Sequence, residues 1–387
     1  MGELEEYINP RLKEIQISGI RKIANKVAGY PDALSLTIGQ PDFPTPDHIL
    51  RAAEKAIADQ RTVYTPNAGL PELRKAAAAF MDTKYGLQYD PVEEVIVTVG
   101  ASQALDITLR TILQPGAEVI LPGPIYPGYE PLVRLCGGTP VYVDTRQNGF
   151  KLTAELLEPH LTENTRCIIL CYPSNPTGRV MSERELADMA ALLQDRKLFV
   201  VSDEIYSELI YDAPHRSIAS LPGMREKTIV INGLSKSHSM TGWRIGFTFA
   251  PAYLSQHMVK AHQYNVTCAS SISQYAAIEA LTAGRDDALP MKAEYMKRRD
   301  FVYDRLQGMG FDLVKPEGAF YLFPSIERFG MPSMEFTLRL LEEKRVAVVP
   351  GDAFSVYGEG HIRISYAYAM NVLESGMERL EAFVKGL

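Results

Sequence analysis

Six short runs of apolar residues constrain the fold of this chain more than any other feature of its sequence. They read EVIVTVG (94–100), AEVILPG (117–123), TPVYVD (139–144), RCIILCYP (166–173), KLFVVSDE (197–204) and TIVINGLS (228–235). Each is nearly continuous in Val, Ile and Leu, which is typical of strands covered on both faces. Helical patterns lie between them, for example at 101–113 and at 182–195, where Ser182 and Glu185 predict a capping box. The alternation predicts an α/β domain with a mainly parallel sheet between layers of helices.

The pattern changes after about residue 286, so we expect the 387 residues to form a large and a smaller domain. A long helical pattern is followed by short strands in GAFYLFP and HIRISYA and by a terminal helix. We therefore expect a large α/β domain over 45–285 and a smaller α+β domain over 286–387. The N-terminal segment 1–44 is expected to return beside the smaller domain.

Charge and hydropathy exclude several classes of protein. The formal net charge is −7, and no cluster of Lys and Arg suggests a nucleic-acid partner. The N-terminus lacks an apolar signal core and no stretch approaches 18 apolar residues, so we expect a cytoplasmic protein without a membrane partner. Four cysteines are too few for a disulfide framework. Cys167 and Cys171 fall on one face of a predicted strand and are expected to be core thiols rather than metal ligands.

Polar residues follow the predicted strands, at the edge where ligands of open α/β sheets bind. Gly100-Ala101-Ser102-Gln103 opens a helix and offers backbone N–H groups to an anion, although an ordinary helix cap explains the same residues. The loop around Asn175 contains two prolines and a glycine; it either fixes the amide direction or is only a turn. Asp203 ends another strand, where a carboxylate can pair with a buried cation or cap a helix, and Tyr206 follows it.

Lys236 lies between two serines after the last predicted strand. A lone lysine is ordinarily solvated, but a desolvated lysine has a depressed pKa and becomes a nucleophile that can form an imine. Arg244, eight residues later, is near enough in sequence to reach the same anion as the 100–103 turn. Taken together, these polar positions favour one buried reactive site over a set of unrelated local explanations.

Several of these segments resemble a known family when they are taken in order. The runs IGQPDF, SNPTG, VSDEIY and GLSKSHSMTGWRIG are similar to those of the class I aminotransferases of pyridoxal-phosphate fold type I. The resemblance extends from Leu34 to Ile364. It implies a large domain with a mainly parallel, mixed sheet between helices, a smaller α+β domain, pyridoxal 5'-phosphate as cofactor, and amino-acid and 2-oxo-acid substrates.

The same resemblance assigns cofactor contacts. Lys236 would hold the cofactor as a Schiff base and then shuttle the substrate proton. Asp203 would pair with the pyridinium nitrogen, Tyr206 and Asn175 would hydrogen-bond to the ring oxygen, and Tyr126 would stack on the ring. The predicted phosphate cradle consists of Ala101, Ser102, Ser235 and Arg244.

The resemblance also implies substrate contacts and a partner. Arg363 in HIRISYA matches the arginine that binds the substrate α-carboxylate. A guanidinium suits this role because it can donate two parallel hydrogen bonds to a carboxylate. The alternative is that Arg363 forms an ordinary salt bridge at the edge of a strand. Gly39 matches a backbone contact to the same carboxylate, with Asn175 close by. Tyr64 in VYTPNAG matches a tyrosine that reaches the phosphate of a neighbouring subunit, which implies a homodimer with shared active sites.

Within the class, the runs SLTIGQPDF, PGPIYPGYEP and SDEIYSEL are similar to those of the N-acetyl-LL-diaminopimelate aminotransferases of lysine biosynthesis. That resemblance implies transfer of an amino group to 2-oxoglutarate. The segment 262–265 lacks the second arginine of strict dicarboxylate enzymes, so a dedicated aspartate site is not required. An aspartate, aromatic or alanine aminotransferase and a C–S lyase remain alternatives. A DNA-binding regulator is disfavoured, since the fold is expected to begin by about residue 30.

Overall fold

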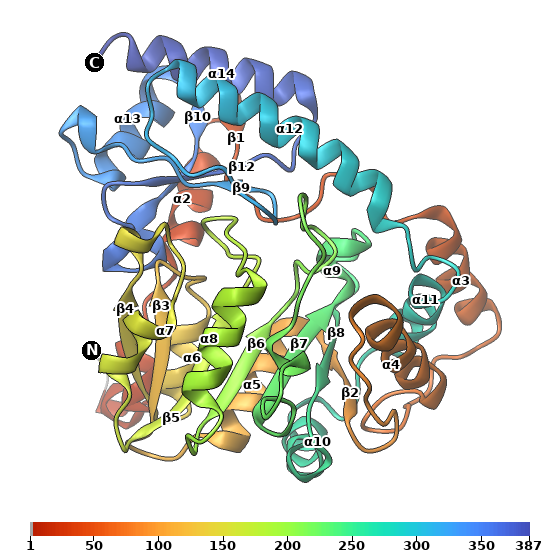
Figure 1. Ribbon diagram of the computed structural model, residues 1–387. Coiled ribbons are helices and arrows are strands. Elements are labelled where there is room, and N and C mark those ends of the chain that lie inside the picture. Colours follow the sequence, from red (N-terminus) through yellow and green to blue (C-terminus); the bar gives the residue numbers. More distant parts are fainter. Residues whose placement is uncertain (1–2) are drawn as a thin grey trace.

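A seven-stranded sheet forms the centre of the computed structural model, which describes residues 3–387 (Figure 1). Its strands are β2 (Val95–Val99), β3 (Glu118–Gly123), β4 (Thr139–Asp144), β5 (Thr165–Cys171), β6 (Phe199–Asp203), β7 (Thr228–Gly233) and β8 (Ile245–Phe249). They lie in the order β2-β8-β7-β6-β5-β3-β4, and only β8 runs antiparallel to its neighbours. The predicted mainly parallel sheet is therefore confirmed.

Helices cover both faces of the sheet, as the continuous apolar runs predict. On β5, Cys167 and Ile169 belong to one buried cluster with helix α5 (Gly100–Ile112), while Ile168 and Leu170 belong to another with helix α8 (Glu183–Leu193). Figure 1 shows these two helices on opposite sides of the sheet. Burying an aliphatic side chain of this size contributes about 1.5–3 kcal/mol, so both faces stabilise the sheet. The predicted capping box of Ser182 and Glu185 is present at the start of α8.

The other helices of the sheet-containing half complete these layers. They are α3 (Asp47–Ala58), α4 (Pro71–Tyr85), α6 (Tyr129–Leu135), α7 (Ala154–Leu157), α9 (Leu234–Ser237), α10 (Ala252–Val266) and α11 (Ser271–Leu281). All four cysteines are free, and Cys167 and Cys171 lie in the same buried cluster, so the prediction of core thiols is confirmed. Among residues 3–387, no helix combines the length and apolar character needed to cross a membrane.

The C-terminal part of the chain forms a second group of elements above the large sheet (Figure 1). Its strands are β9 (Tyr321–Leu322), β10 (Val346–Ala347), β11 (Val349–Pro350) and β12 (Ile362–Ser365), and its helices are α12 (Ala288–Gly308), α13 (Ser333–Lys344) and α14 (Met370–Val384). Strands β11, β12 and β9 form an antiparallel sheet in that order. The N-terminal segment contributes α1 (Pro10–Glu14), α2 (Gly19–Val27) and β1 (Leu34–Ser35), and β1 pairs in parallel with β10. The domain limits 1–44, 45–285 and 286–387 stay a prediction.

One histidine fastens the start of α12 to the helices of the large sheet. His48, in the first turn of α3, contacts Glu279 of α11 through Nδ1 at 2.9 Å and Asp287 through Nε2 at 2.8 Å. Asp287 is the residue directly before α12. Burial lowers the pKa of His48, but hydrogen bonds to the two carboxylates outweigh burial and raise it. The two carboxylates therefore favour the charged form of this imidazole at the junction.

We expect His48→Gln to destabilise the protein more at pH 6 than at pH 9. Because the folded-state pKa of His48 is raised, its stabilisation is fully present below the unfolded value of about 6.5 and is lost as the pH rises through the folded value. Thermal melts at both pH values measure the effect. His257→Gln, at an exposed histidine, is the matched control and should show no such difference. An equal deficit at both pH values would contradict a charged His48.

Candidate functional site

Lys236 lies on the short helix α9, directly after strand β7. Its Nζ donates to the backbone oxygen of Gly39 at 2.5 Å, so the N-terminal segment and the sheet meet at this lysine. Burial lowers the pKa of Lys236 to about 8, the charges of Arg363 and Arg244 lower it further, and Asp203 opposes them. At pH 7 about one in ten such amines is neutral, against about one in three thousand for an ordinary lysine. The amine is thus available as a nucleophile.

Asp203 ends strand β6 and is buried close to Lys236. Tyr129 donates its hydroxyl to Oδ2 at 2.7 Å, and the backbone N–H of Ile205 donates to Oδ1 at 3.2 Å. Burial raises the pKa of Asp203 to about 6, although both hydrogen bonds lower it. A buried carboxylate of this kind is stabilised by a cation beside it, and the predicted pairing with a protonated ring nitrogen would supply one.

Arg363 on strand β12 is fully buried. Its Nη1 donates to the side-chain oxygen of Asn175 at 2.9 Å, and its Nη2 donates to the backbone oxygen of Thr37. Among the described residues, no carboxylate pairs with this guanidinium, and its Nε has no hydrogen-bond partner. The strand-edge salt bridge considered above is therefore not formed. A buried cation without a counter-ion suits an anionic ligand.

Two tyrosine hydroxyls meet beside Lys236. Tyr206, three residues after Asp203, and Tyr321 on strand β9 are both buried, and their hydroxyl oxygens lie 2.7 Å apart. The ring of Tyr321 lies under the guanidinium of Arg363, with 4.5 Å from Cζ to the ring centroid. A Cβ built on Gly39 would clash with the Tyr321 hydroxyl, so only glycine allows this approach. Tyr321 thus contacts three of the predicted site residues.

The predicted anion cradle lies at the start of helix α5. Gly100 has φ 73°, and a Cβ there would meet the Arg244 guanidinium at 2.5 Å. A Cβ on Gly246 of β8 would lie 2.5 Å from the carbonyl carbon of Gly100, so two glycines allow the arginine and strand to approach this turn. Arg244 itself is exposed and has φ 56°. Around it, Ser102 is exposed, Ala101 half-buried and Ser235 buried.

The structure describes the two remaining predicted residues in different settings. Tyr126 is half-buried and makes an edge contact with Tyr129, with 5.4 Å between ring centroids. Tyr64 has 84% of its surface exposed, and the side-chain hydrogen bonds of Lys236 and Arg244 in the described residues go to Gly39 and Thr241 instead. Tyr126 therefore joins the cluster around Asp203, while Tyr64 faces solvent.

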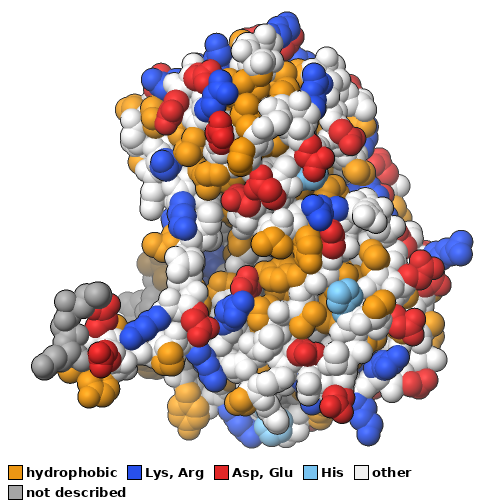
Figure 2. Space-filling view, turned by 90° about the vertical axis from the view of Figure 1, so that its left-hand side faces the viewer, with side chains coloured by type: hydrophobic (Ala, Val, Ile, Leu, Met, Phe, Trp, Pro, Cys, Tyr) orange, Lys and Arg blue, Asp and Glu red, His pale blue; other side chains and the backbone are white. Residues whose placement is uncertain are grey.

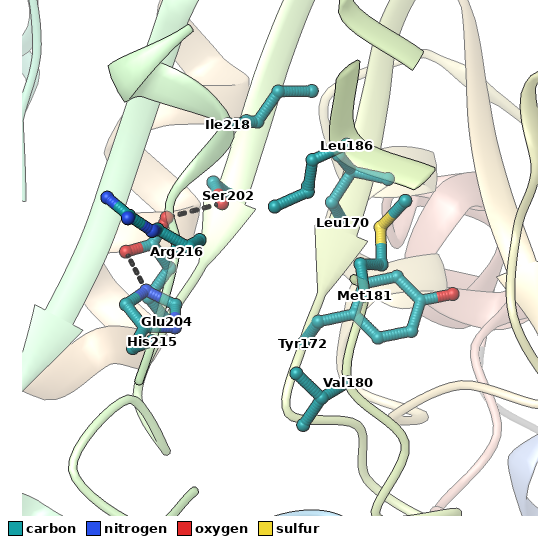
Figure 3. Close-up of a pocket in the computed structure, with 10 residues that line it drawn as sticks. All are labelled: Leu170, Tyr172, Val180, Met181, Leu186, Ser202, Glu204, His215, Arg216 and Ile218. Carbon is teal, nitrogen blue, oxygen red and sulfur yellow. Dashed lines mark hydrogen bonds and ion pairs between the residues drawn. The ribbon is translucent and has the colours of Figure 1, made fainter. Parts of the chain in front are cut away.

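A separate pocket lies behind strand β6 and does not contain Lys236 (Figure 3). Its polar wall centres on the buried Glu204, which accepts hydrogen bonds from Ser202 at 2.7 Å and Ser217 at 2.5 Å and contacts His215 at 2.7 Å. Because side chains alternate along a strand, Ser202 and Glu204 point away from Asp203. The charge of Glu204 nevertheless contributes to the raised pKa of Asp203. This cluster supports the strand that carries Asp203.

Sequence reasoning missed two residues of the site, Tyr129 and Tyr321. Tyr129 carried a usable signal, since it follows Tyr126 by three residues and opens helix α6, so both rings can face the same sheet edge. Tyr321 carried none. It lies 115 residues after Tyr206, and only the docking of β9 beside the large sheet brings the two hydroxyls together.

Comparisons with known proteins agree with this geometry. Residues 31–380 match the family model described as aminotransferase class I and II. The chain is 61% identical to a probable N-acetyl-LL-diaminopimelate aminotransferase of Bacillus subtilis, over 98% of this chain and 96% of the relative. It is 45% identical to an aspartate aminotransferase of Pyrococcus abyssi, over 98% of each chain. The crystal structure of an aromatic aminotransferase from Pyrococcus horikoshii superposes with a TM-score of 0.90 at 44% identity, covering 94% of this chain and 99% of that one.

These matches cover nearly the whole chain, and the solved neighbours superpose on it with TM-scores of 0.90 and 0.93. The matches include both aspartate and aromatic aminotransferases. Similarity to them therefore identifies the family of this chain but does not identify its substrate. The fold predicted from the sequence is the fold of these structures. The chain belongs to the class I and II aminotransferase family.

Proposed function

We propose that this aminotransferase works with pyridoxal 5'-phosphate and that Lys236 holds the cofactor. The observation that carries the proposal is the amine of half-buried Lys236, whose pKa is lowered to about 8 by burial and by the charges of Arg363 and Arg244, against the opposing charge of Asp203. A nucleophile, an acid and an anion-binding group within mutual electrostatic reach are what amino transfer requires of a protein.

The residues present fit this cofactor. The first turn of α5, with the neighbouring Arg244 guanidinium, suits a phosphate group. The carboxylate of Asp203 suits a protonated ring nitrogen, because its pKa is raised by burial and a cation would stabilise its charge. Pyridoxal phosphate supplies an aldehyde that condenses with amines and a ring that accepts the electron pair released at the substrate α-carbon.

Side chains of this protein would transfer the proton, bind the substrate and orient the cofactor. Nζ of Lys236 would accept the proton released at the substrate α-carbon and hold it for return. The guanidinium of Arg363 holds the substrate α-carboxylate, and its unpartnered Nε supports this role. The hydroxyl of Tyr206 and the amide of Asn175 would hold the ring by hydrogen bonds, and Tyr126 would stack on it. Gly39 contributes its backbone beside the carboxylate.

We further propose N-acetyl-LL-diaminopimelate as amino donor and 2-oxoglutarate as acceptor. The support is the 61% identity to the Bacillus subtilis relative of that name, together with the absence of an arginine from residues 262–265. The products would be glutamate and N-acetyl-2-amino-6-oxopimelate. An aspartate or aromatic donor is the second candidate, favoured by relatives at 42–45% identity that carry those names.

A homodimer with shared active sites completes the proposal. Large apolar and aromatic side chains are exposed in three segments, before helix α4, on helix α10 and at the N-terminus: Tyr64 (84%), Val63 (77%), Tyr264 (87%), Leu4 (80%) and Tyr7 (84%). The segment that begins with residues 3–7 stands out from the body of the molecule (Figure 2). Exposed apolar surface of this extent suits a second copy of the chain. Tyr64 would then reach the phosphate of the neighbouring subunit.

A panel of amino donors with 2-oxoglutarate tests the reaction and the substrate together. We expect N-acetyl-LL-diaminopimelate to give stoichiometric glutamate and to bleach the absorbance of the lysine-bound cofactor, with aspartate and aromatic donors slower. Bleaching by an aspartate or aromatic donor alone would overturn the substrate. Pyruvate and ammonia formed without an acceptor would overturn transfer itself in favour of a lyase.

A further inference from the structure

The hydroxyl groups of Tyr206 and Tyr321 form a hydrogen bond in which either group can be the donor. The oxygens are 2.7 Å apart, both rings are buried, and a pair at this distance uses one proton between them. If Tyr206 donates to Tyr321, the proton of Tyr206 is not available for a hydrogen bond to another acceptor. If Tyr321 donates, the proton of Tyr206 remains free for a second acceptor.

The surroundings favour Tyr321 as the donor. Burial raises the pKa of Tyr321 to about 12, and the positive charge of Arg363 over its ring partly offsets that rise. Burial and the neighbouring Tyr321 raise the pKa of Tyr206 well above its usual range. Cζ of Arg363 lies 4.5 Å from the centroid of the Tyr321 ring, whereas Nζ of Lys236 lies 5.9 Å from that of Tyr206, so the nearer cation makes Tyr321 the more acidic phenol. The more acidic phenol is the better donor, and we therefore assign the proton between the two oxygens to Tyr321. The proton of Tyr206 is then free for a second acceptor, on the side of the site where Nζ of Lys236 lies 5.9 Å from the centroid of its ring.

We propose that Tyr321 is a positioning residue: its hydroxyl donates to Tyr206 and, through Tyr206, sets how tightly Nζ of Lys236 holds its proton when the cofactor is bound. This inference rests on the proposed function, in which Tyr206 donates to the ring oxygen of the cofactor. A donor that itself accepts a hydrogen bond is polarised and donates more strongly. Stronger donation stabilises negative charge on the ring oxygen, which in turn favours loss of the proton from Nζ.

Tyr321 also contacts both Gly39, which accepts a hydrogen bond from Nζ of Lys236, and Arg363, the proposed binding group for the substrate carboxylate. Its ring lies 4.5 Å from Cζ of Arg363, while its hydroxyl lies against Gly39, whose backbone oxygen accepts from Lys236. Ring and hydroxyl therefore have separable tasks. Removing the hydroxyl should change the proton at Nζ, whereas removing the ring should weaken the support under Arg363.

The test is a spectrophotometric pH titration of the holoenzyme and its Tyr321→Phe variant. We expect the midpoint of the cofactor absorbance change to rise by about 0.5–1 pH unit in the variant, as loss of one hydrogen bond predicts. The KM for the amino donor should stay within about twofold, because the ring remains under Arg363. Tyr206→Phe should raise the midpoint at least as far, and adding Tyr321→Phe to it should raise it no further.

Tyr366→Phe is the matched control, because it removes a buried hydroxyl from the neighbouring Tyr366–Tyr211 pair in the same core cluster. Its midpoint should equal that of the wild type. A wild-type midpoint in Tyr321→Phe, with Tyr206→Phe shifted, would overturn the role of Tyr321. An additive shift in the double variant would also overturn it. A wild-type protein without any pH-dependent cofactor band would instead overturn the proposed function.

Discussion

Replacing Lys236 with alanine is expected to lower turnover by at least about 10⁴-fold, since the change removes a nucleophile and a general acid–base group together. The lowered pKa of Lys236, about 8, is the physical basis: the protein keeps a fraction of this amine neutral near pH 7. Single-turnover and steady-state rates measure the loss. Pyridoxal phosphate should still bind the variant through the α5 turn and Asp203, but without the absorbance of a lysine-bound cofactor.

Borohydride reduction gives a second readout. In the wild type it should fix the cofactor covalently to the peptide that contains Lys236, and mass spectrometry locates it. Lys55→Ala, at an exposed lysine paired with Asp59, is the control and should retain full activity. Turnover of Lys236→Ala near the wild-type rate, or covalent label on another lysine, would remove Lys236 from the mechanism.

Replacing Asp203 with asparagine is expected to lower kcat by about 10²–10³-fold, because a preorganised charge is removed while the shape of the side chain is kept. The same substitution should leave the stability of the cofactor-free protein at pH 8 unchanged or increase it. The folded-state pKa of Asp203 is raised to about 6, so the stability that this group contributes is present below its unfolded value near 3.9 and is lost as the pH rises through 6. At pH 8 the ionised carboxylate therefore costs stability in the cofactor-free protein.

The two measurements together separate catalysis from folding. Cofactor-free Asp203→Asn should melt at or above the wild-type temperature at pH 8, yet its holoenzyme should be slow. Asp59→Asn, at an exposed carboxylate, should change neither. A variant that melts well below the wild type at pH 8 would show that the lost activity is a loss of fold. Full activity would remove Asp203 from the mechanism.

Much of the fold could be predicted because the apolar runs are long and the sheet is covered on both faces. The six runs agree with β2 to β7 within two residues at each end. Strand β8 was missed. It is fully buried, but Gly246 and Thr248 interrupt its apolar pattern, and it follows directly on the Arg244 turn. Burial of Thr248 depends on neighbouring strands, which a local pattern does not contain.

The residues of the candidate site that directly follow a predicted strand could be located from the sequence. Lys236 and Asp203 each follow a recognisable strand, so the sheet edge brings them together. Arg363 and Tyr321 come from the C-terminal strands β12 and β9, and only the resemblance identified the first of them. No local pattern could give the contact of Tyr321 with Tyr206, because it depends on how two separately patterned parts of the chain pack.

The pairing of β1 with β10 has a consequence for synthesis of the protein. Residues 34–36 pair with the strand that begins at Val346, and the backbone oxygen of Thr37 accepts a hydrogen bond from Arg363, more than 300 residues later in the chain. A nascent chain can form much of the large sheet while still attached to the ribosome. It cannot assemble the carboxylate-binding end of the site until Arg363 has been translated. Truncated products would therefore hold Lys236 but lack the means to bind its substrate.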